Sequence, residues 1–334
     1  MKTHFSSAIM LSAGVVAMSA LTTGLAAPEP AALRAKAKEI LAPLPDKMPG
    51  AEKDTKEMVA LGEKLYFEKR LSINEKLSCN SCHLVDQARA GVDNEPTSEG
   101  AHGQRGDRNS PTTLNAGFHF AQFWDGRAKN LEEQAKGPVL NPVEMAMPEE
   151  PEVVRRLSQD KQYPKMFKAA FPGEANPITY DNFARAVAAF ERTLRTHDRF
   201  DDFLNGDDKA LNAQELYGLD LFLTTGCTTC HTGPTIGGNM YQKVGLIHPY
   251  ANTNDLGRIK VTEEDSDAYR FKVPSLRNVA LTWPYFHDGK AASLESAIKQ
   301  MAYMQLDKKL SDEDIAALKA FLGSLSDKTR HPAR

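Results

Sequence analysis

Apolar residues recur at helical spacing in two long segments of the chain. Between residues 180 and 194, one face of a helix would carry Phe183, Val187, Phe190 and Leu194. The segment 311–325 begins with a serine, a residue that often caps helix N-termini, and it carries a second apolar face. No stretch alternates apolar and polar residues for long enough to predict a sheet. The pattern therefore predicts a mainly α fold.

Proline and glycine interrupt this helical pattern in three regions, at residues 91–111, 137–151 and 233–256. Loops of this length are uncommon in a compact domain unless something else anchors them. The chain has 334 residues, which exceeds the usual length of one domain. We expect two domains, 27–176 and 177–334, divided near the sequence FPGEANP at 171–177.

The N-terminus has the pattern of a secretory signal. An apolar and small-residue run from Ala8 to Leu25 follows Lys2 and His4, and it ends in a small-x-small cleavage motif before Pro28. A membrane anchor is the alternative, but serine and threonine dilute the hydrophobicity that a membrane span needs. We interpret residues 1–26 as a signal peptide and predict a soluble protein exported to a bacterial periplasm.

The overall charge excludes one class of partner. The chain carries 41 basic and 44 acidic residues, with a formal net charge of −3. This balance offers no basic excess for a polyphosphate partner, so we do not expect nucleic-acid binding. A hydrophobic content of 41% is sufficient for packed cores.

All four cysteines fall in two copies of one motif, CNSCH at 79–83 and CTTCH at 227–231. An exported protein would ordinarily pair its cysteines as disulfides. Histidine is rare, however, at 9 of 334 residues, and it follows both pairs. A zinc site would need its two cysteine pairs much closer together, and a thioredoxin-like redox pair gives no role to the histidines. The repeated motif indicates covalent attachment of two c-type haems.

The spacing within each motif suits that chemistry. Two thiols on one helical turn can bond the two vinyl groups of a haem, and the next residue then offers its imidazole to the iron. The predicted thioether residues are Cys79, Cys82, Cys227 and Cys230. The predicted proximal ligands are His83 and His231, and the function depends on the opposite ligand of each iron.

An internal repeat shows where the two halves differ. Residues 111–132 and 274–295 share many identities at a shift of 163, which indicates two related haem domains. Met301 follows the second copy on the apolar side of an expected helix, where a thioether could ligate the second iron. The equivalent position in the first half is Pro138, which cannot ligate.

The first iron therefore needs another sixth ligand, and His102 is the candidate. It lies in a glycine-rich segment, 85–108, whose irregular backbone would allow the ligand to be withdrawn. An ordinary surface histidine is the alternative interpretation. Other possible ligands are Met145 and Met147 in the first domain and Met240, Met304 and His287 in the second.

Two long segments carry a resemblance to a known family. RNSPTTLNAGFHFAQFWDGRAKNLEEQAKGPVLNPVEM, at 108–145, and FKVPSLRNVALTWPYFHDG, at 271–289, resemble the bacterial di-haem cytochrome c peroxidases. With the haem motifs, the match extends from about Leu61 to Leu325. The resemblance implies two c-type cytochrome domains in tandem, each with one covalently attached haem. It also implies reduction of hydrogen peroxide to water with electrons from a small c-type cytochrome or a blue copper protein.

The family also implies roles for individual residues. The His83 haem would be the low-potential peroxide site, with His102 as removable ligand and with Gln134 and Glu144 lining the pocket. The His231 haem, held by Met301, would be the high-potential site of electron entry. Trp124 would relay electrons between the haems. A calcium site would use the side chain of Asn109 and the carbonyls of Thr282 and Pro284, and the protein would be a homodimer.

Alternative interpretations remain for these residues and for the whole chain. Glu144 could be a solvated loop carboxylate, Gln134 part of a plain helix face and Trp124 a packing residue. The chain could be a non-enzymatic di-haem electron carrier, which would leave Glu144 without a task. A MauG-like relative that oxidises protein tryptophans is a second alternative. The resemblance implies that such a relative would have a tyrosine at the position of Met301, so the methionine argues against it.

Overall fold

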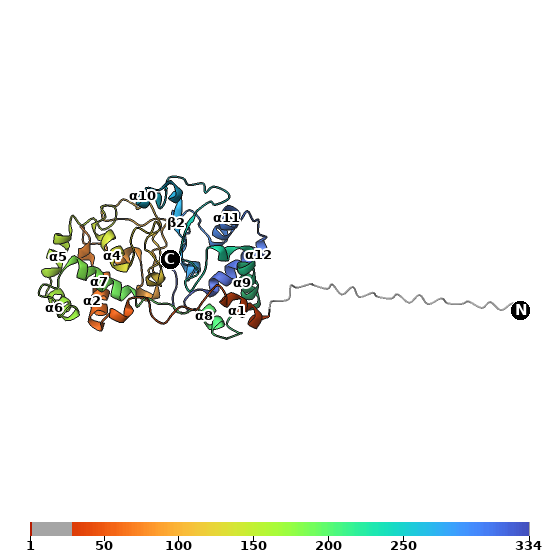
Figure 1. The fold of residues 1–334 in the computed structure, drawn as a ribbon, viewed down its shortest axis with the longest axis horizontal. Coiled ribbons are helices and arrows are strands. Elements are labelled where there is room, and N and C mark those ends of the chain that lie inside the picture. Colours follow the sequence, from red (N-terminus) through yellow and green to blue (C-terminus); the bar gives the residue numbers. More distant parts are fainter. Residues whose placement is uncertain (2–28, 334) are drawn as a thin grey trace.

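The computed structural model describes Met1 and residues 29–333, so nearly all of the predicted signal peptide, 1–26, lies outside the described residues. The described chain forms two helical lobes that lie side by side (Figure 1). Its C-terminal end lies between the lobes. Within residues 29–333, no helix has the length and apolar character needed to cross a membrane. The predicted mainly α fold is confirmed.

Each lobe has its own apolar core. The helices that build the first lobe are α2 (Lys56–Tyr66), α4 (Leu131–Leu140), α5 (Glu150–Ser158), α6 (Tyr163–Ala170) and α7 (Tyr180–Glu191). Those that build the second lobe are α1 (Pro30–Lys38), α8 (Arg199–Leu204), α9 (Ala213–Thr225), α11 (Leu294–Leu306) and α12 (Asp312–Ser324). Two one-turn helices, α3 (Cys79–Cys82) and α10 (Ile259–Thr262), lie in the long connections.

The two cores repeat one helix crossing. In the first lobe α2 packs on α7, and a Cβ added to Gly62 would lie 1.8 Å from the carbonyl oxygen of Ala186. In the second lobe α9 packs on α12, and a Cβ at Gly218 would lie 2.0 Å from the carbonyl oxygen of Ala317. Only glycine permits backbones to approach this closely. Each crossing positions the helix, α2 or α9, that precedes a Cys-x-x-Cys-His motif in the chain.

The lobes do not follow the expected division at residues 176 and 177. Helix α7 lies after that division, yet Phe183 and Val187 are fully buried in the first core. Helix α1 lies before it, yet Leu33 and Ala37 belong to the second core. The apolar face of a helix shows that it must be covered, but not which core covers it.

The helical faces read from the sequence are buried. The side chains on the α12 face, Ile315, Leu318, Phe321 and Leu322, are at most 7% exposed, and Ser311 Oγ caps this helix by accepting from the N–H of Asp314. The described residues also contain one small antiparallel sheet of strands β1 (Tyr241–Lys243) and β2 (Arg270–Lys272), with Tyr241 opposite Lys272. Strands of three residues are too short to show an alternating pattern in the sequence.

Candidate functional site

The first Cys-x-x-Cys-His segment forms one helical turn at the edge of a cavity. Ser78 starts the turn with a reciprocal cap to Ser81, and the N–H of His83 donates to the carbonyl of Cys79 over 3.0 Å. Cys79, Cys82 and His83 all line one cavity of about 870 Å³, here called the His83 cavity. Neither cysteine is part of a disulfide within the described residues. The turn thus presents two thiols and one imidazole to the same space, which fits covalent attachment of a haem.

The backbone fixes the orientation of the His83 ring. Its Nδ1 lies 2.9 Å from the carbonyl oxygen of Pro111, to which the N–H donates. This bond leaves Nε2 unprotonated and able to bind a metal. Burial lowers the pKa of His83, which favours the neutral form that a metal requires. The Tyr66 hydroxyl donates to the carbonyl of His83 over 2.6 Å and holds this residue from the other side.

The second motif is built in the same way on a different turn. Helix α9 ends at Gly226, whose φ of 110° turns the chain into a 3-10 helix at Cys227–Thr229. The N–H of His231 donates to the carbonyl of Cys227 over 3.0 Å. Burial lowers the pKa of His231 to about 4. Its Nδ1 donates to the carbonyl oxygen of Ile236 over 3.1 Å, so Nε2 is again available to a metal.

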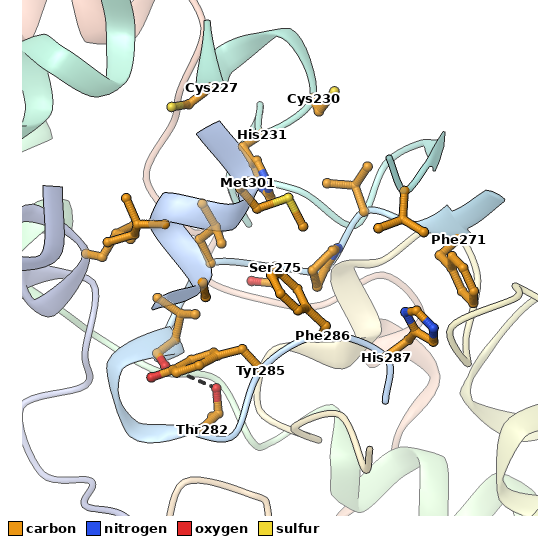
Figure 2. Close-up of a pocket in the computed structure, with 18 of the residues that line it drawn as sticks. Cys227, Cys230, His231, Phe271, Ser275, Thr282, Tyr285, Phe286, His287 and Met301 are labelled. Carbon is orange, nitrogen blue, oxygen red and sulfur yellow. Dashed lines mark hydrogen bonds between the residues drawn. The ribbon is translucent and has the colours of Figure 1, made fainter. Parts of the chain in front are cut away.

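Met301 comes from helix α11 to the same cavity as His231. This cavity, here called the His231 cavity, encloses about 270 Å³ and is also lined by Cys227 and Cys230 (Figure 2). Figure 2 shows Met301 beside His231 among largely apolar lining residues. A thioether and an imidazole in one apolar cavity are a suitable pair of axial ligands for a haem iron. The structure thus brings together the four residues that the sequence assigned to the second haem.

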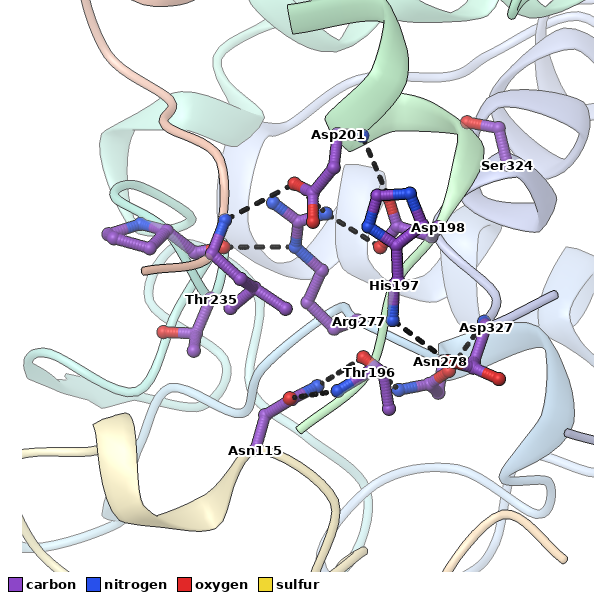
Figure 3. A network of polar contacts seen from close by, with 12 residues as sticks. Asn115, Thr196, His197, Asp198, Asp201, Thr235, Arg277, Asn278, Ser324 and Asp327 are labelled. Atoms are coloured by element: carbon purple, nitrogen blue, oxygen red, sulfur yellow. Dashed lines mark hydrogen bonds and ion pairs between the residues drawn. The ribbon is translucent and has the colours of Figure 1, made fainter. Parts of the chain in front are cut away.

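A buried ion-pair cluster supports the loop that orients His231 (Figure 3). Arg277 is fully buried and donates to Asp198 over 2.6 Å, while Asp201 lies 2.9 Å from the same Nη1. Its Nε donates to the carbonyl of Pro234 over 2.9 Å. Pro234 lies two residues before Ile236, the residue that accepts from His231. The cluster therefore fixes the segment that sets the imidazole's orientation.

One wall separates the two cavities. The residues that line both are 109–112, His119, Phe123, Trp124 and Lys272. Trp124 is held there because its Nε1–H donates to the carbonyl of Asn109 over 2.8 Å. Its ring meets His287 edge to face, with centroids 6.4 Å apart. The structure thus places the tryptophan at the boundary between the cavities.

Glu144 and Gln134 both line the His83 cavity. The Nδ2 of Asn141 donates to Glu144 Oε1 over 2.7 Å and orients this carboxylate. Gln134 projects from helix α4, which begins with an Asn130 cap. Met145 lines the same cavity, whereas Met147 is buried in the core of the first lobe and does not. An oriented carboxylate in a partly enclosed cavity can accept and return a proton.

The structure does not bring His102 into the His83 cavity. His102 is exposed and is absent from the residues that line it. The loop around it is nevertheless attached to the segment that carries Glu144. The N–H of Ala101 donates to the carbonyl of Glu144 over 2.7 Å, and Gln104 Nε2 donates to the carbonyl of Pro142 over 2.7 Å. Any movement of His102 toward His83 would therefore disturb the Glu144 segment.

The three residues expected at a calcium site line the His231 cavity. The Nδ2 of Asn109 donates to the carbonyl of Glu95 over 2.9 Å. Asn94 Nδ2 donates to the carbonyls of Leu281 and Trp283, which flank Thr282. Nowhere in residues 29–333 do three or more His, Cys, Asp or Glu side chains gather as a metal site. A site made of one amide and two carbonyls has no such cluster, so the calcium site stays a prediction.

Two buried charged residues beside the cavities had not been singled out from the sequence. Glu191 lines the His83 cavity, and burial raises the pKa of this carboxyl to about 8. Lys272 lines both cavities, and burial lowers its pKa to about 8. The repeat contains a signal for Lys272, because the equivalent residue of the first half is Asn109. Lys272 lies between the apolar residues Phe271 and Val273, and the two halves of the repeat carry different residues at this position. These two features make it a candidate functional residue.

The chain is similar to known proteins over both lobes. The family model described as di-haem cytochrome c peroxidase matches residues 56–209, and the one described as cytochrome c matches residues 216–326. Cytochrome c551 peroxidase of Pseudomonas aeruginosa is 45% identical over 305 residues, which cover 89% of this chain and 87% of that protein. The cytochrome c551 peroxidase of Nitrosomonas europaea is 45% identical over 272 residues, which cover 81% of this chain and 80% of the relative.

A solved structure shares most of this fold. The crystal structure of a MauG-like protein associated with microbial copper homeostasis superposes with a TM-score of 0.76 at 29% identity, and the match covers 85% of this chain and 94% of that one. The two matched families follow one another along the chain. The predicted tandem of cytochrome-type domains is therefore confirmed.

Proposed function

The chain belongs to the di-haem cytochrome c peroxidase family, and we propose that it reduces hydrogen peroxide to water with electrons from a small soluble redox protein. The observation that carries this proposal is the inequality of two cavities built on the same motif. Met301 enters the His231 cavity, whereas Glu144 and Gln134 line the larger His83 cavity. One cavity suits electron transfer and the other suits a small oxidant.

We propose two covalently bound haem c groups. Cys79 and Cys82 would hold the first and Cys227 and Cys230 the second, with the iron ligands described above. When bound, the haems would supply the redox chemistry, one taking electrons from the donor and the other passing them to peroxide. The hydrogen bonds from both Nδ1 atoms to backbone carbonyls support this assignment.

Glu144 is the proposed proton-transfer residue. Converting hydrogen peroxide into two waters consumes two electrons and two protons, and a proton must move from one peroxide oxygen to the other. Asn141 holds Glu144 Oε1 by a 2.7 Å hydrogen bond, which leaves Oε2 for the substrate. Gln134 lines the same cavity and would position the peroxide by hydrogen bonding.

Trp124 and His102 have separate proposed roles. Trp124 lies in the wall shared by both cavities and would carry electrons between them. His102 would be the removable sixth ligand of the first haem, released when the second haem is reduced. The glycine-rich loop around His102 supports this role, because an irregular backbone can move; in the described conformation His102 lies outside the His83 cavity.

Further properties belong to the same proposal. The donor would be a c-type cytochrome or a blue copper protein, and the protein would act as a homodimer in the bacterial periplasm. Calcium would be bound by the side chain of Asn109 and the carbonyls of Thr282 and Pro284. The location of these three residues along one cavity supports a common site between the lobes.

Steady-state peroxide consumption by the holoprotein tests the proposal. With reduced cytochrome c as donor, we expect peroxide-dependent oxidation of that donor. A chain that carries two haems but consumes no peroxide would be an electron carrier. Oxidation of protein tryptophans without turnover of the cytochrome donor would instead indicate MauG-like activity.

The His102→Gly variant tests the removable ligand. We expect the wild-type protein to consume peroxide only after prior reduction, and this variant to consume it without that step. The control is His248→Asn, because His248 lies in the second lobe and pairs with Asp307 at 2.6 Å. This control should activate like the wild type. A His102→Gly variant that still requires reduction would exclude His102 as the ligand.

A further inference from the structure

Lys272 is a buried ammonium group without an anionic partner. Its side chain lies at the end of strand β2, and the residue is 6% exposed. Among the described residues, no carboxylate comes within 4.0 Å of its Nζ. Asp125 is close enough to influence Lys272, but its carboxylate pairs with Arg108 at 2.6 Å and with Arg127 at 3.1 Å. A buried cation of this kind is costly unless an anion accompanies it.

His119 adds a second donor at the same place. Lys272 Nζ lies 3.2 Å from His119 Nδ1, so the ammonium donates to that nitrogen. This contact makes Nδ1 the acceptor and places the ring proton on Nε2. His119 Nε2 is itself buried, with no hydrogen-bond partner in the structure. A buried N–H without an acceptor destabilises the folded chain, which indicates that an acceptor belongs there.

The position of the pair identifies the kind of acceptor. Lys272 and His119 both lie in the wall shared by the two cavities. In the His231 cavity, Lys272 is the one Lys or Arg among the lining residues, and none of them is an Asp or Glu. The His83 cavity has Arg108, Arg127 and Lys260 in addition. A carboxylate entering the His231 cavity would therefore find Lys272 as its sole full positive charge.

A haem carries such carboxylates, because each porphyrin of this type bears two propionate groups. We propose that Lys272 and His119 form the binding site for a propionate of the haem in the His231 cavity. This inference rests on the proposed function, since it needs a haem at Cys227, Cys230 and His231. The ammonium would donate to one carboxylate oxygen, and His119 Nε2–H would donate to the same group. The pair satisfies two buried donors and neutralises one buried charge.

The site also has a consequence for electron transfer. A positive charge beside a haem stabilises the reduced form, which carries one more electron, and so raises its reduction potential. The backbone N–H of Lys272 donates to the backbone carbonyl of Trp124 over 2.7 Å, and both residues line the shared wall, so Lys272 is held next to the proposed relay residue. Lys272 would thus help to make the His231 haem the first of the two haems to be reduced.

Spectroelectrochemical titration of the two haems tests this site. In Lys272→Met holoprotein, we expect the potential of the His231 haem to fall clearly and that of the His83 haem to change less. Lys272→Arg retains the charge and should restore most of the wild-type value. Lys260→Met is the matched control, because Lys260 is exposed and lines only the His83 cavity. This control should leave the potential of the His231 haem unchanged.

A second measurement follows the carboxylate directly. Resonance Raman spectra of the His231 haem should show a shifted propionate bending mode in Lys272→Met and in Lys272→Gln, either of which suffices if the other loads haem poorly. Unchanged potentials and unchanged bending modes in these variants would overturn the site. So would a fall confined to the His83 haem. Wild-type protein lacking a second haem would instead refute the proposed function, so the two failures are distinguishable.

Discussion

The two cavities are both built on a Cys-x-x-Cys-His motif, but most of the other residues that line them differ. The His231 cavity encloses about 270 Å³, and Met301 and mainly apolar side chains line it. The His83 cavity encloses about 870 Å³ and has acidic side chains from six residues, namely Glu99, Asp107, Asp125, Glu144, Glu191 and Asp255. The motif would therefore determine where a haem binds, while the residues around it would determine which chemistry can take place there.

The supports of the two histidines differ as well. The carbonyl acceptor of His83 belongs to Pro111, while that of His231 belongs to a loop held by buried Arg277. In the repeat, the residue equivalent to Arg277 is Leu114, which is buried in the first core. One lobe thus uses apolar packing where the other uses an ion-pair cluster. The two lobes therefore differ in their interiors as well as in their cavities.

The largest expected effect concerns the acidic lining of the His83 cavity. Glu144→Gln keeps the size of the side chain and can keep the bond from Asn141, but it cannot carry a proton. We expect kcat/KM for peroxide to fall by about 10²- to 10⁴-fold, with both haem spectra unchanged. The control Glu133→Gln, on the outer face of α4, should retain full activity, since Glu133 does not line the cavity. Undiminished turnover in Glu144→Gln would remove the proton-transfer role.

The next prediction compares the ion-pair cluster around Arg277 with the apolar packing around Leu114, the equivalent residue of the first lobe. Arg277→Met leaves Asp198 and Asp201 buried without their cation, and we expect the free energy of unfolding to fall by about 3 to 5 kcal/mol. Leu114→Met, at the equivalent position, preserves volume and should cost less than about 1.5 kcal/mol. Denaturant unfolding of each holoprotein, followed by circular dichroism, measures both values. Equal losses in the two variants would show that the lobes are supported alike.

The last effect varies with pH and concerns Glu191, a buried acid with no counterpart among the residues that line the His231 cavity. Burial raises the pKa of this carboxyl from 4.5 to about 8. Between these values the folded chain keeps a proton that the unfolded chain releases, so stability falls as pH rises. Glu191→Gln should remove up to about 1.4 kcal/mol of this loss per pH unit. Unfolding curves from pH 5 to 8 measure it.

A matched variant controls the pH experiment. Glu57 is an exposed residue on α2, and Glu57→Gln should keep the pH dependence of the wild type. A Glu191→Gln variant whose stability changes with pH as steeply as the wild type would contradict the assignment of this slope to Glu191.

The sequence was most informative where the chemistry depends on residues in short motifs. The two Cys-x-x-Cys-His segments could be recognised as candidate haem sites from spacing alone, and the repeat directed attention to Met301 and to its missing counterpart at Pro138. The structure places Met301 beside His231. Both observations depend on local patterns, which a single sequence records well.

Properties that depend on distant partners could not be read in this way. The division between lobes was placed too early, because the apolar face of α7 does not specify which core covers it. Arg277 and Asp198 are separated by 79 residues, and nothing local marks them as a buried pair. Lys272 and His119 are 153 residues apart, so their contact emerged only from the fold. The position of His102 could not be predicted either, because it depends on hydrogen bonds between its loop and residues 142–144.

The most direct test of two inequivalent centres is a ligand-binding titration of the half-reduced holoprotein, followed by absorption and EPR spectroscopy. After one electron has been added, we expect the haem at His231 and Met301 to be reduced and the haem at His83 to bind an added small ligand such as cyanide. A protein with one haem, or with two that both refuse the ligand at every stage of reduction, would contradict the account.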